Sequence, residues 1–569
     1  MKLDPIDERV LVDRPGVSGA SAQRFTVRFT GSSNVLGGDR RERDQFDGVD
    51  LDLTKSDSVA AALLDPWPLP QPDRERDVSD KDVVAQLAAE IHDSALDIVA
   101  RRAGSVGCGM LTELRIENFK AWRDTGRVRL APLTFLFGAN SSGKSSLHQF
   151  LLMLRQTVES PDRRRVLHTG DASTPVDLGS YVDLIHRRDP TRALDFELSW
   201  KLREALDVLD AKTGHRTRGG AMTFAARVQA VGSTPPRVQV ASFSYRLHAI
   251  ANHEDLTLGL EREKQGAYRV VAHGYQPVMT MGRKWPVSGP SHFHAFPDDL
   301  QTRFQNLEFA PDLTLRLEQQ LSSVVYLGPL RERPVRLYRW SGEEPEHVGW
   351  RGERTVDALL AGQGRRFNLK RKRLKPLQVM VAEWLKRLEV IEAFAVLPIG
   401  HGRDEYEVRV RAPGSREEVL LTDVGFGVSQ VLPVVTLCFY AAPQSTIILE
   451  QPEIHLHPAV QAGLADLFIE AAAMREDGAP RNLQLIVESH SEHLLRRLLR
   501  RIADGSVDPE TVAAYFVRLG PSAAVIEPLD VDELGNVRNW PKNFFGDQTT
   551  DILEQTRHAR QRRQLQAVG

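Results

Sequence analysis

A glycine-rich segment of this chain offers the residue types that can hold a phosphate group. It reads Gly138-Ala-Asn-Ser-Ser-Gly-Lys-Ser145. Its two glycines allow backbone turns that side chains would block, so successive amide N–H groups can point at the oxygens of one anion. Lys144 can then reach the β and γ phosphates of a nucleoside triphosphate, and the Ser145 hydroxyl can bind Mg2+. The predicted nucleotide-binding residues of this segment are Gly138, Asn140, Ser141, Ser142, Gly143, Lys144, Ser145 and Ser146.

An acid at the end of a later apolar segment can complete such a site. Thr446-Ile-Ile-Leu-Glu450 reads as a strand that ends in a carboxylate, and a carboxylate can organise hydrated Mg2+. The bland alternative is a buried strand that ends in a surface acid, but the tail Gln451-Pro-Glu-Ile-His-Leu-His-Pro458 favours the metal role. We predict that Ser145 and Glu450 meet around one Mg2+ ion.

Two further polar turns can reach a phosphate. The first is Gly425-Phe-Gly-Val-Ser-Gln430, which leads into an apolar helix at about residues 431–442. Backbone and side-chain donors of Gly427, Ser429 and Gln430 are suited to this contact. The second contains His490, which follows an apolar strand and could hydrogen-bond a γ phosphate. A histidine at a strand end is more often structural, but its order in the chain, after the other three motifs, favours a sensor role.

The elements around these residues predict how they come together. The apolar run at 135–137 reads as a strand, and residues 147–154 read as a helix whose N-terminus faces the phosphates. The carboxyl ends of parallel strands lie on one edge of a sheet, so residues far apart in sequence can share one site. Alternating segments at 111–119, 194–200 and 242–248 predict antiparallel strands beside it.

Composition bounds the class of protein. The 569 residues contain 74 Lys and Arg against 76 Asp and Glu, so any nucleic-acid surface must be a local patch. Only Cys108 and Cys438 occur, which excludes a disulfide framework and a four-cysteine zinc site. No segment resembles a membrane span or a signal peptide. We expect a soluble, cytoplasmic protein.

Changes of character along the chain suggest its domains. Residues 1–109 are charged or proline-rich and read as an N-terminal extension that is largely linker, with one helix from Ser79 to about Arg102. The remaining expected parts are an ATPase lobe with the phosphate loop at 110–200, an insertion with a β extension at 201–415, a second ATPase lobe at 416–506 and a small C-terminal domain at 507–569.

Two basic features of the insertion have open roles. Seven of the eleven residues from Arg365 to Lys375 are basic, enough to bind a nucleic-acid backbone through counterion release. A charge run is more often a solvated face, so DNA contact is a hypothesis here. Arg331 and Arg333 follow a predicted strand and could hold phosphate or pair with neighbouring acids, and the sequence does not choose between these roles.

Taken in order, these motifs resemble a known group. A Walker A segment at 138–145, a signature-like turn at 425–430, a Walker B strand at 447–450, a D-loop-like 455–458 and a switch His490 resemble the ABC-type ATPase heads of the SMC, RecF and OLD group. The closest likeness is to bacterial AAA-type ATPases of the OLD-like class, through residues 114–122, 450–458 and the C-terminal 539–547. The fold class expected from this resemblance is α/β: a P-loop NTPase with a mixed sheet, an antiparallel β extension and a large, mainly helical insertion.

The resemblance implies an ATPase that dimerises around two nucleotides. Ser429 and Gln430 of one chain would then act on the phosphate loop of the other. Gln451 stands where ABC heads carry the glutamate that polarises the attacking water, and an amide is a very poor proton acceptor. Glu453 could substitute, which predicts slow hydrolysis that depends on Glu453. The predicted catalytic residues are Lys144, Glu450, Gln451, Glu453 and His490.

The expected biological context is also drawn from the resemblance. It is a DNA-related process such as genome maintenance or antiphage defence, with a possible effector protein as partner and no membrane. One alternative is a nucleotide-gated binding scaffold with little intrinsic hydrolysis, suggested by Gln451. A transporter ATPase is a weaker alternative, because such subunits are usually much shorter and lack large insertions.

Overall fold

The computed structural model describes two compact units, Met1–Val99 and Ala100–Gly569. In the first it describes only a small antiparallel sheet of β1 (Leu11–Val12), β2 (Phe25–Arg28) and β3 (Val49–Leu51). In the second it describes residues 109–568 except 211, 213, 215, 233–235, 251–253, 283–285, 370–372, 401, 542–543 and 545–547. The helix expected from Ser79 to Arg102 lies outside the described residues.

A six-stranded sheet forms the centre of the second unit. Four of its pairings are parallel, and the last one is antiparallel. Its strands, in spatial order, are β13 (Val324–Leu327), β20 (Thr446–Glu450), β23 (Gln484–Ser489), β7 (Leu133–Gly138), β24 (Val512–Leu519) and β25 (Ala524–Pro528). This is the mixed sheet that the sequence predicted, and β7, β20 and β23 are the apolar strands that carry the motifs.

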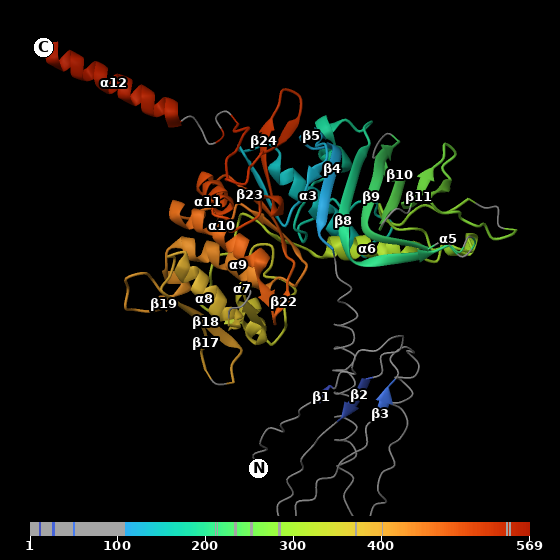
Figure 1. The fold of residues 1–569 in the computed structure, drawn as a ribbon, viewed down its shortest axis with the longest axis horizontal. Helices are drawn as coiled ribbons and strands as arrows, with labels where there is room; N and C mark the ends of the chain where they lie inside the picture. The colour runs from blue at the N-terminus through green and yellow to red at the C-terminus, as the bar shows by residue number, and fades with distance from the viewer. Residues whose placement is uncertain are drawn as a thin grey trace, which may run out of the picture. The chain divides into compact units, whose positions relative to one another are not determined.

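Helices cover both faces of this sheet (Figure 1). Its strands are buried on both sides, as their continuous apolar runs require. Leu136, Ile448 and Ile486 belong to the core that includes α3 (Lys144–Val158), whereas Phe135, Ile447 and Leu485 belong to the core on the other face. The helices of that other face are α9 (Phe426–Tyr440), α10 (Pro458–Ala473) and α11 (Glu492–Ala503).

A second, antiparallel sheet extends from the first core. Its order is β12-β11-β10-β9-β8-β4-β5, with the short β6 paired to β4. The strands are β4 (Leu111–Phe119), β5 (Trp122–Asp124), β6 (Val128–Arg129), β8 (Leu194–Leu209), β9 (Arg216–Val231), β10 (Arg237–Ala249), β11 (Leu256–Arg262) and β12 (Tyr268–His273). The inward side chains alternate along these strands, which is the pattern of a sheet with one packed face.

The remaining elements qualify the expected insertion. The insertion at 201–415 was expected to be mainly helical. Its first part instead continues the antiparallel sheet through strands β9–β12, and the helices of its described residues lie in its later part. That later part contains the helices α5 (Leu300–Arg303), α6 (Ala310–Ser322), α7 (Thr355–Ala361) and α8 (Leu377–Arg387). Two small sheets accompany them, ordered β14-β18-β17 with β19 on β18, and β16-β15-β21-β22.

The bounds of the other short elements are as follows. They are α4 (Tyr181–Leu184), β14 (Tyr338–Arg339), β15 (Arg366–Asn368), β16 (Lys375–Pro376), β17 (Ala393–Pro398), β18 (Glu405–Arg411), β19 (Val419–Leu420), β21 (Arg475–Glu476), β22 (Ala479–Pro480) and α12 (Gln548–Val568). Within the described part of the chain, no helix combines the length and the apolar character needed to cross a membrane.

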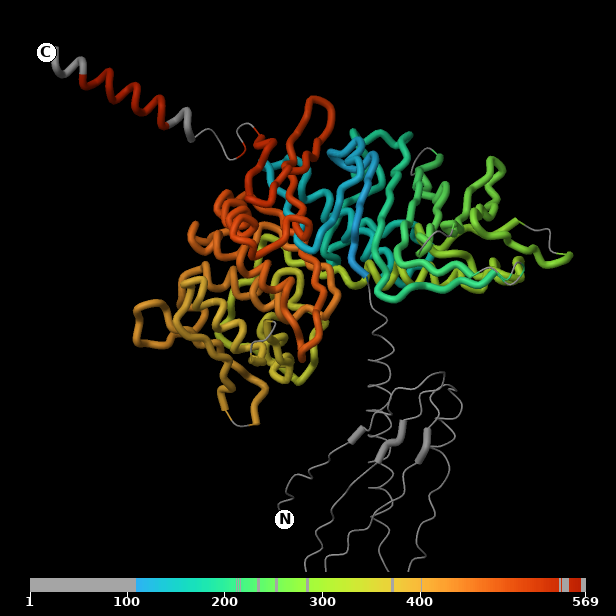
Figure 2. Tube along the Cα trace, viewed as in Figure 1, coloured from blue at the N-terminus to red at the C-terminus, as the bar shows by residue number. Residues whose placement is uncertain are grey.

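The buried Gln484 side chain joins the two large sheets. Its Oε1 accepts hydrogen bonds from Leu111 N and the Thr446 hydroxyl, at 3.2 and 3.1 Å. Its Nε2 donates to the carbonyls of Leu111 and Ala131, at 2.8 and 3.1 Å. Leu111 begins β4 of the antiparallel sheet, while Gln484 and Thr446 begin β23 and β20. Segments distant in sequence therefore meet here, as the tube in Figure 2 also shows for the blue and orange parts of this unit.

Candidate nucleotide site

The phosphate loop has the backbone conformation that its glycines allow. It connects the end of β7 to the start of α3, with φ of 146° at Gly138 and 105° at Gly143. A Cβ atom at Gly138 would lie 2.0 Å from the Val517 carbonyl oxygen, so no side chain fits there. Ser142 is buried, and its hydroxyl has no hydrogen-bond partner among the described residues. A phosphate group would supply that missing partner, so the loop fits the nucleotide predicted for it.

Lys144 lies folded back over this loop. Its ammonium donates hydrogen bonds to the carbonyls of Gly138 at 3.1 Å and Ala139 at 2.8 Å. It also lies 3.8 Å from Glu488 Oε1. Burial lowers the pKa of Lys144, and the Glu488 charge opposes that shift. A buried ammonium held beside an anion cradle is suited to neutralise the β and γ phosphates.

Two glutamates face each other on adjacent strands at the edge of the sheet that carries the loop. Glu450 ends β20 and is in register with Glu488 on β23, which lies between β20 and β7. The Ser145 hydroxyl donates to Glu488 Oε1 at 3.1 Å, and the Tyr326 hydroxyl donates to Glu450 Oε2 at 2.7 Å. The two predicted metal ligands, Ser145 and Glu450, are thus gathered on either side of Glu488.

Glu488 is the site residue that the sequence reading overlooked. It is 2 % exposed, and burial together with the charge of Glu450 raises its pKa to about 7. The available signal was a second acid at the end of an apolar strand, two residues before His490. Acids are rarely fully buried unless they have a charged or metal partner. An acid near the end of an apolar strand is therefore expected at the surface, and the sequence alone does not show that Glu488 is buried.

Glu453 and His490 form a second pair beside the loop. The backbone N–H of His490 donates to Glu453 Oε1 at 2.6 Å. Glu453 is 7 % exposed, and burial raises its pKa, although the His490 N–H partly offsets that effect. Burial and the nearby Lys144 charge lower the pKa of His490, whose ring also interacts with the Gly138 backbone. His490 therefore reaches the phosphate loop from the neighbouring strand.

The turn after β20 holds Gln451 and Arg331. Gln451 has a left-handed backbone, with φ of 45°, and its N–H donates to the Glu488 carbonyl at 2.9 Å.

Arg331 is buried and donates to the carbonyls of Pro329, Gln451 and Glu450. Burial lowers its pKa to about 10. Its hydrogen bonds go to backbone carbonyls that shape the turn, and the nearby charges of Glu453 and Glu450 partly oppose the lowering of its pKa. Of the two roles left open for this arginine, the interaction with neighbouring acids is therefore the one that the structure supports. Arg333 is exposed.

The signature-like turn leads into α9 with two of its predicted residues buried. Helix α9 begins at Phe426, and the side chains of Ser429 and Gln430 point inward, with 6 % and 2 % exposure. The Ser429 hydroxyl donates to the Phe426 carbonyl at 2.8 Å. Both side chains therefore lie within the fold of the single chain, where Gln430 Nε2 has no hydrogen-bond partner among the described residues, and their action on a partner's phosphate stays a prediction. The exposed residues at this helix start are Gly425 and Phe426, with Gly427 half-buried.

The basic segment is partly used in holding the fold together. Arg365 forms an ion pair with Glu476 at 2.6 Å, and Lys375 forms one with Glu383 at 2.6 Å. Arg366 donates to the Gln363 carbonyl, and Arg373 is exposed. Only part of the run from Arg365 to Lys375 is therefore available to an anionic partner, and residues 370–372 lie outside the described part of the chain.

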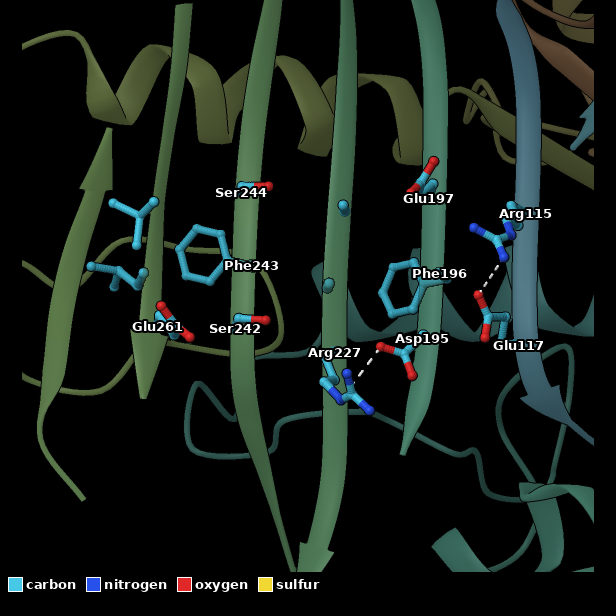
Figure 3. Close-up of a pocket in the computed structure, with 14 residues that line it drawn as sticks. Arg115, Glu117, Asp195, Phe196, Glu197, Arg227, Ser242, Phe243, Ser244 and Glu261 are labelled. Carbon is cyan, nitrogen blue, oxygen red and sulfur yellow. Dashed lines mark ion pairs between the residues drawn. The ribbon is translucent and has the colours of Figure 1, made fainter. Parts of the chain in front are cut away.

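A separate cavity of about 360 Å³ lies on the antiparallel sheet (Figure 3). Ion pairs cross it, from Arg115 to Glu117 at 2.7 Å and from Arg227 to Asp195 at 3.6 Å. None of the predicted nucleotide-site residues lines it. Its arginines and acids pair within the sheet, and the cavity is separate from the phosphate loop.

Comparisons with known proteins agree with an ATPase site. Residues 291–496 match a family model described as "AAA domain, putative AbiEii toxin, Type IV TA system", and residues 507–555 match "Protein of unknown function (DUF3696)". The first match includes Glu450, Gln451, Glu453, Glu488 and His490. No curated protein matches the sequence.

Several solved structures of SMC heads are similar over much of the chain. One, an SMC head bound to the C-winged helix domain of ScpA, has a TM-score of 0.35 and 9 % identity and covers 74 % of this chain and 98 % of its own. The SMC head domain from Thermotoga maritima gives 0.33, 13 %, 74 % and 99 % for the same quantities. An Smc head with an extended coiled coil, from Pyrococcus furiosus, gives 0.33, 8 %, 79 % and 99 %. Likeness at this level carries no functional argument.

The strand, loop and helix geometry and the AAA-domain match point the same way. The chain has the mixed α/β fold of a P-loop ATPase, with an antiparallel extension, as the sequence predicted. The AAA-domain match supports an ATP-binding ATPase.

Proposed function

We propose that this chain binds ATP with Mg2+ at the phosphate loop and hydrolyses it slowly. The observation that carries the proposal is the convergence on one edge of the sheet of Lys144, from the start of α3, with Glu488 and His490, from the end of β23 far along the chain. Glu450 joins them through its register with Glu488. A buried cation, two carboxylates and a histidine beside a glycine-rich loop are the groups that phosphoryl transfer to water requires.

In this proposal each site residue has its own role. Lys144 binds the β and γ phosphates, and Ser145 with Glu450 would hold Mg2+, which neutralises charge that develops on the phosphates. Glu453 accepts a proton from the attacking water. Its buried position raises its pKa, which strengthens it as a base at neutral pH. Gln451 orients water without accepting a proton. His490 contacts the γ phosphate and distinguishes ATP from ADP.

We further propose that two chains close around the nucleotides, as in OLD-like ATPases. The exposed start of α9, at Gly425 and Phe426, supports this, because backbone N–H groups at a helix N-terminus can cover phosphates presented by a second chain. Asn140 and Ser141 of the loop are exposed and available for such a contact. The cycle would serve a DNA-related process such as genome maintenance or antiphage defence.

The test is ATP turnover by the purified chain with Mg2+, with and without double-stranded DNA. Lys144→Ala and Glu450→Gln should each abolish turnover. Glu527→Gln serves as a control, because Glu527 of β25 forms an exposed ion pair with Arg518 of β24. Turnover that survives both site substitutions would overturn the proposal. Stimulation by DNA would support the DNA-related role.

A binding scaffold with little hydrolysis is the second candidate. Gln451 favours it, as does the engagement of Glu453 with the His490 N–H, which reduces the capacity of Glu453 to take a proton. Tight ATP binding that is lost in Lys144→Ala, without any turnover in the presence of DNA, would select this alternative.

A further inference from the structure

His148 is a buried histidine whose ring makes no hydrogen bond within the described part of the chain. It lies one turn into α3, three residues after Ser145, and is 1 % exposed. Neither of its ring nitrogens has a hydrogen-bond partner among the described residues, and the same is true of Glu488 Oε2. Buried polar atoms are nearly always satisfied, so orphaned nitrogen and oxygen atoms side by side point to a missing ligand.

These orphaned atoms converge with a third group. His148 Nδ1 lies 3.6 Å from Glu488 Oε2. One donor atom each from His148, Glu450 and Glu488 can be chosen so that all lie within 4.8 Å of one another. Metal–ligand bonds of about 2.1 Å place neighbouring donor atoms roughly 3 Å apart and opposite ones roughly 4 Å apart. The 4.8 Å limit is slightly wider than this spacing, so the three donors would have to move a little closer together to bind one central ion.

A buried ion pair alone does not explain the arrangement. At 3.6 Å, His148 Nδ1 and Glu488 Oε2 are too far apart for a good hydrogen bond. A contact through Nδ1 would also leave Nε2 without a partner among the described residues. Histidine binds metals through the single basic lone pair of its neutral imidazole.

We propose that His148, Glu450 and Glu488 form a binding site for a divalent transition-metal ion, of which Mn2+ is the representative, and that the ion binds before nucleotide. The proposal deepens the proposed function, since it shares Glu450 with the nucleotide site, but it does not require ATP. Imidazole nitrogen favours first-row transition ions over Mg2+, which prefers oxygen donors alone. The chain would then prefer Mn2+ to Mg2+, a preference that a site built from Ser145 and Glu450 does not confer.

The experiment is a titration of the chelator-treated, nucleotide-free chain with MnCl2, in which electron paramagnetic resonance measures free Mn2+. We expect one bound Mn2+ per chain at this site, and His148→Gln should weaken it by about 10- to 100-fold. Competition by Mg2+ should be poor in the parent chain and improve in the variant. His168→Gln, at another buried histidine next to α3, is the matched control and should leave binding unchanged.

A second measurement needs no variant. Electron spin-echo modulation of the Mn2+-loaded parent chain should show coupling to an imidazole nitrogen. Absence of that coupling, absence of nucleotide-free binding, or equal binding by parent and His148→Gln would overturn the proposal. Mn2+ binding in a chain that never turns over ATP would refute only the proposed function, whereas Mg2+-dependent turnover without Mn2+ binding would refute only the metal site.

Discussion

Glu450 and Glu488 stand opposite each other in register on neighbouring parallel strands, with the Ser145 hydroxyl bonded to Glu488 and the Tyr326 hydroxyl bonded to Glu450. This relationship places two carboxylates beside one ammonium, that of Lys144. The charge of Glu450 helps to raise the pKa of Glu488, and a divalent cation between the two carboxylates would relieve this repulsion.

Glu488→Gln should therefore lower ATP turnover by about 100-fold and raise the concentration of divalent cation needed for half-maximal rate. The substitution removes one charge from the pair while keeping the shape of the side chain. Steady-state turnover across a Mg2+ and a Mn2+ titration measures both effects. A rate and a cation requirement like those of the parent would show that Glu488 is only structural.

Glu453→Gln should reduce turnover by about 100-fold or more while ATP binding is retained, because the amide cannot accept a proton. Fluorescent-nucleotide binding and steady-state turnover together separate the two steps. Glu332→Gln is the matched control, since Glu332 is an exposed acid near the same turn. Equal rates in Glu453→Gln and the parent would assign the proton transfer to another group.

Gly425→Val tests closure of two chains without disturbing one. A Cβ atom at Gly425 meets nothing within 4 Å, and its φ of −56° suits any residue, so the single chain should fold normally. The added bulk would block close approach of the α9 N-terminus to a partner's phosphates. We expect unchanged ATP binding but loss of ATP-dependent dimers by sedimentation. The control is Ala462→Val on α10, which adds bulk while keeping helical geometry. Gly414→Ala, in an exposed loop, would not serve, because the positive φ of Gly414 strains any side chain.

The basic segment calls for selective charge reversal. Arg366→Glu with Arg373→Glu should weaken DNA binding and lessen its dependence on salt, because no described carboxylate pairs with either residue, whereas Arg365 and Lys375 each have one. Filter binding at several salt concentrations measures how steeply the DNA affinity falls with salt. DNA affinity that ignores both salt and the double substitution would exclude this segment as the contact.

The contact between α10 and α11 should depend on pH through Asp466. Its carboxylate accepts hydrogen bonds from Arg497 and Arg501, both at 2.6 Å. Burial alone would raise the pKa of Asp466, but the two arginines outweigh it and hold the pKa below its ordinary value of 3.8. A carboxyl with a depressed folded pKa contributes stability that is present above the unfolded pKa and lost as pH falls through the folded pKa.

Asp466→Asn should therefore lower the free energy of unfolding by roughly 1–2 kcal/mol at pH 7, and this loss relative to the parent should become smaller only below about pH 4. Urea unfolding at a series of pH values measures the free energy of unfolding of both chains. Asp508→Asn, at an exposed short turn, is the comparison. A difference that stayed constant into the acid range would mean that the arginine pairs contribute nothing.

The sequence was informative where chemistry demands fixed spacing. The glycine-rich loop and the strand that ends at Glu450 follow from backbone geometry that few residue types allow, and their meeting follows from the shared edge of a parallel sheet. The antiparallel extension also followed, because alternation along Leu194–Trp200 and Ser242–His248 marks strands with one packed face.

Side-chain direction was beyond the sequence. Nothing in the signature-like turn distinguishes an inward from an outward Ser429 or Gln430, since that depends on where the helix begins and how it packs. Likewise, His148 reads as one more residue of an amphipathic helix until the facing strand places Glu488 against it. The neutralising partners of Arg365 and Lys375 lie on other elements and leave no local pattern.

The four hydrogen bonds of Gln484 have a mechanical consequence. They fasten the first residue of the antiparallel sheet to the same strands that end in Glu450 and Glu488, and each bond contributes about 1 kcal/mol and is costly to leave unmade in the interior. Because β20 and β23 connect these bonds to the two carboxylates, loss of the Gln484 side chain should disturb both the junction of the two sheets and the position of Glu450 and Glu488.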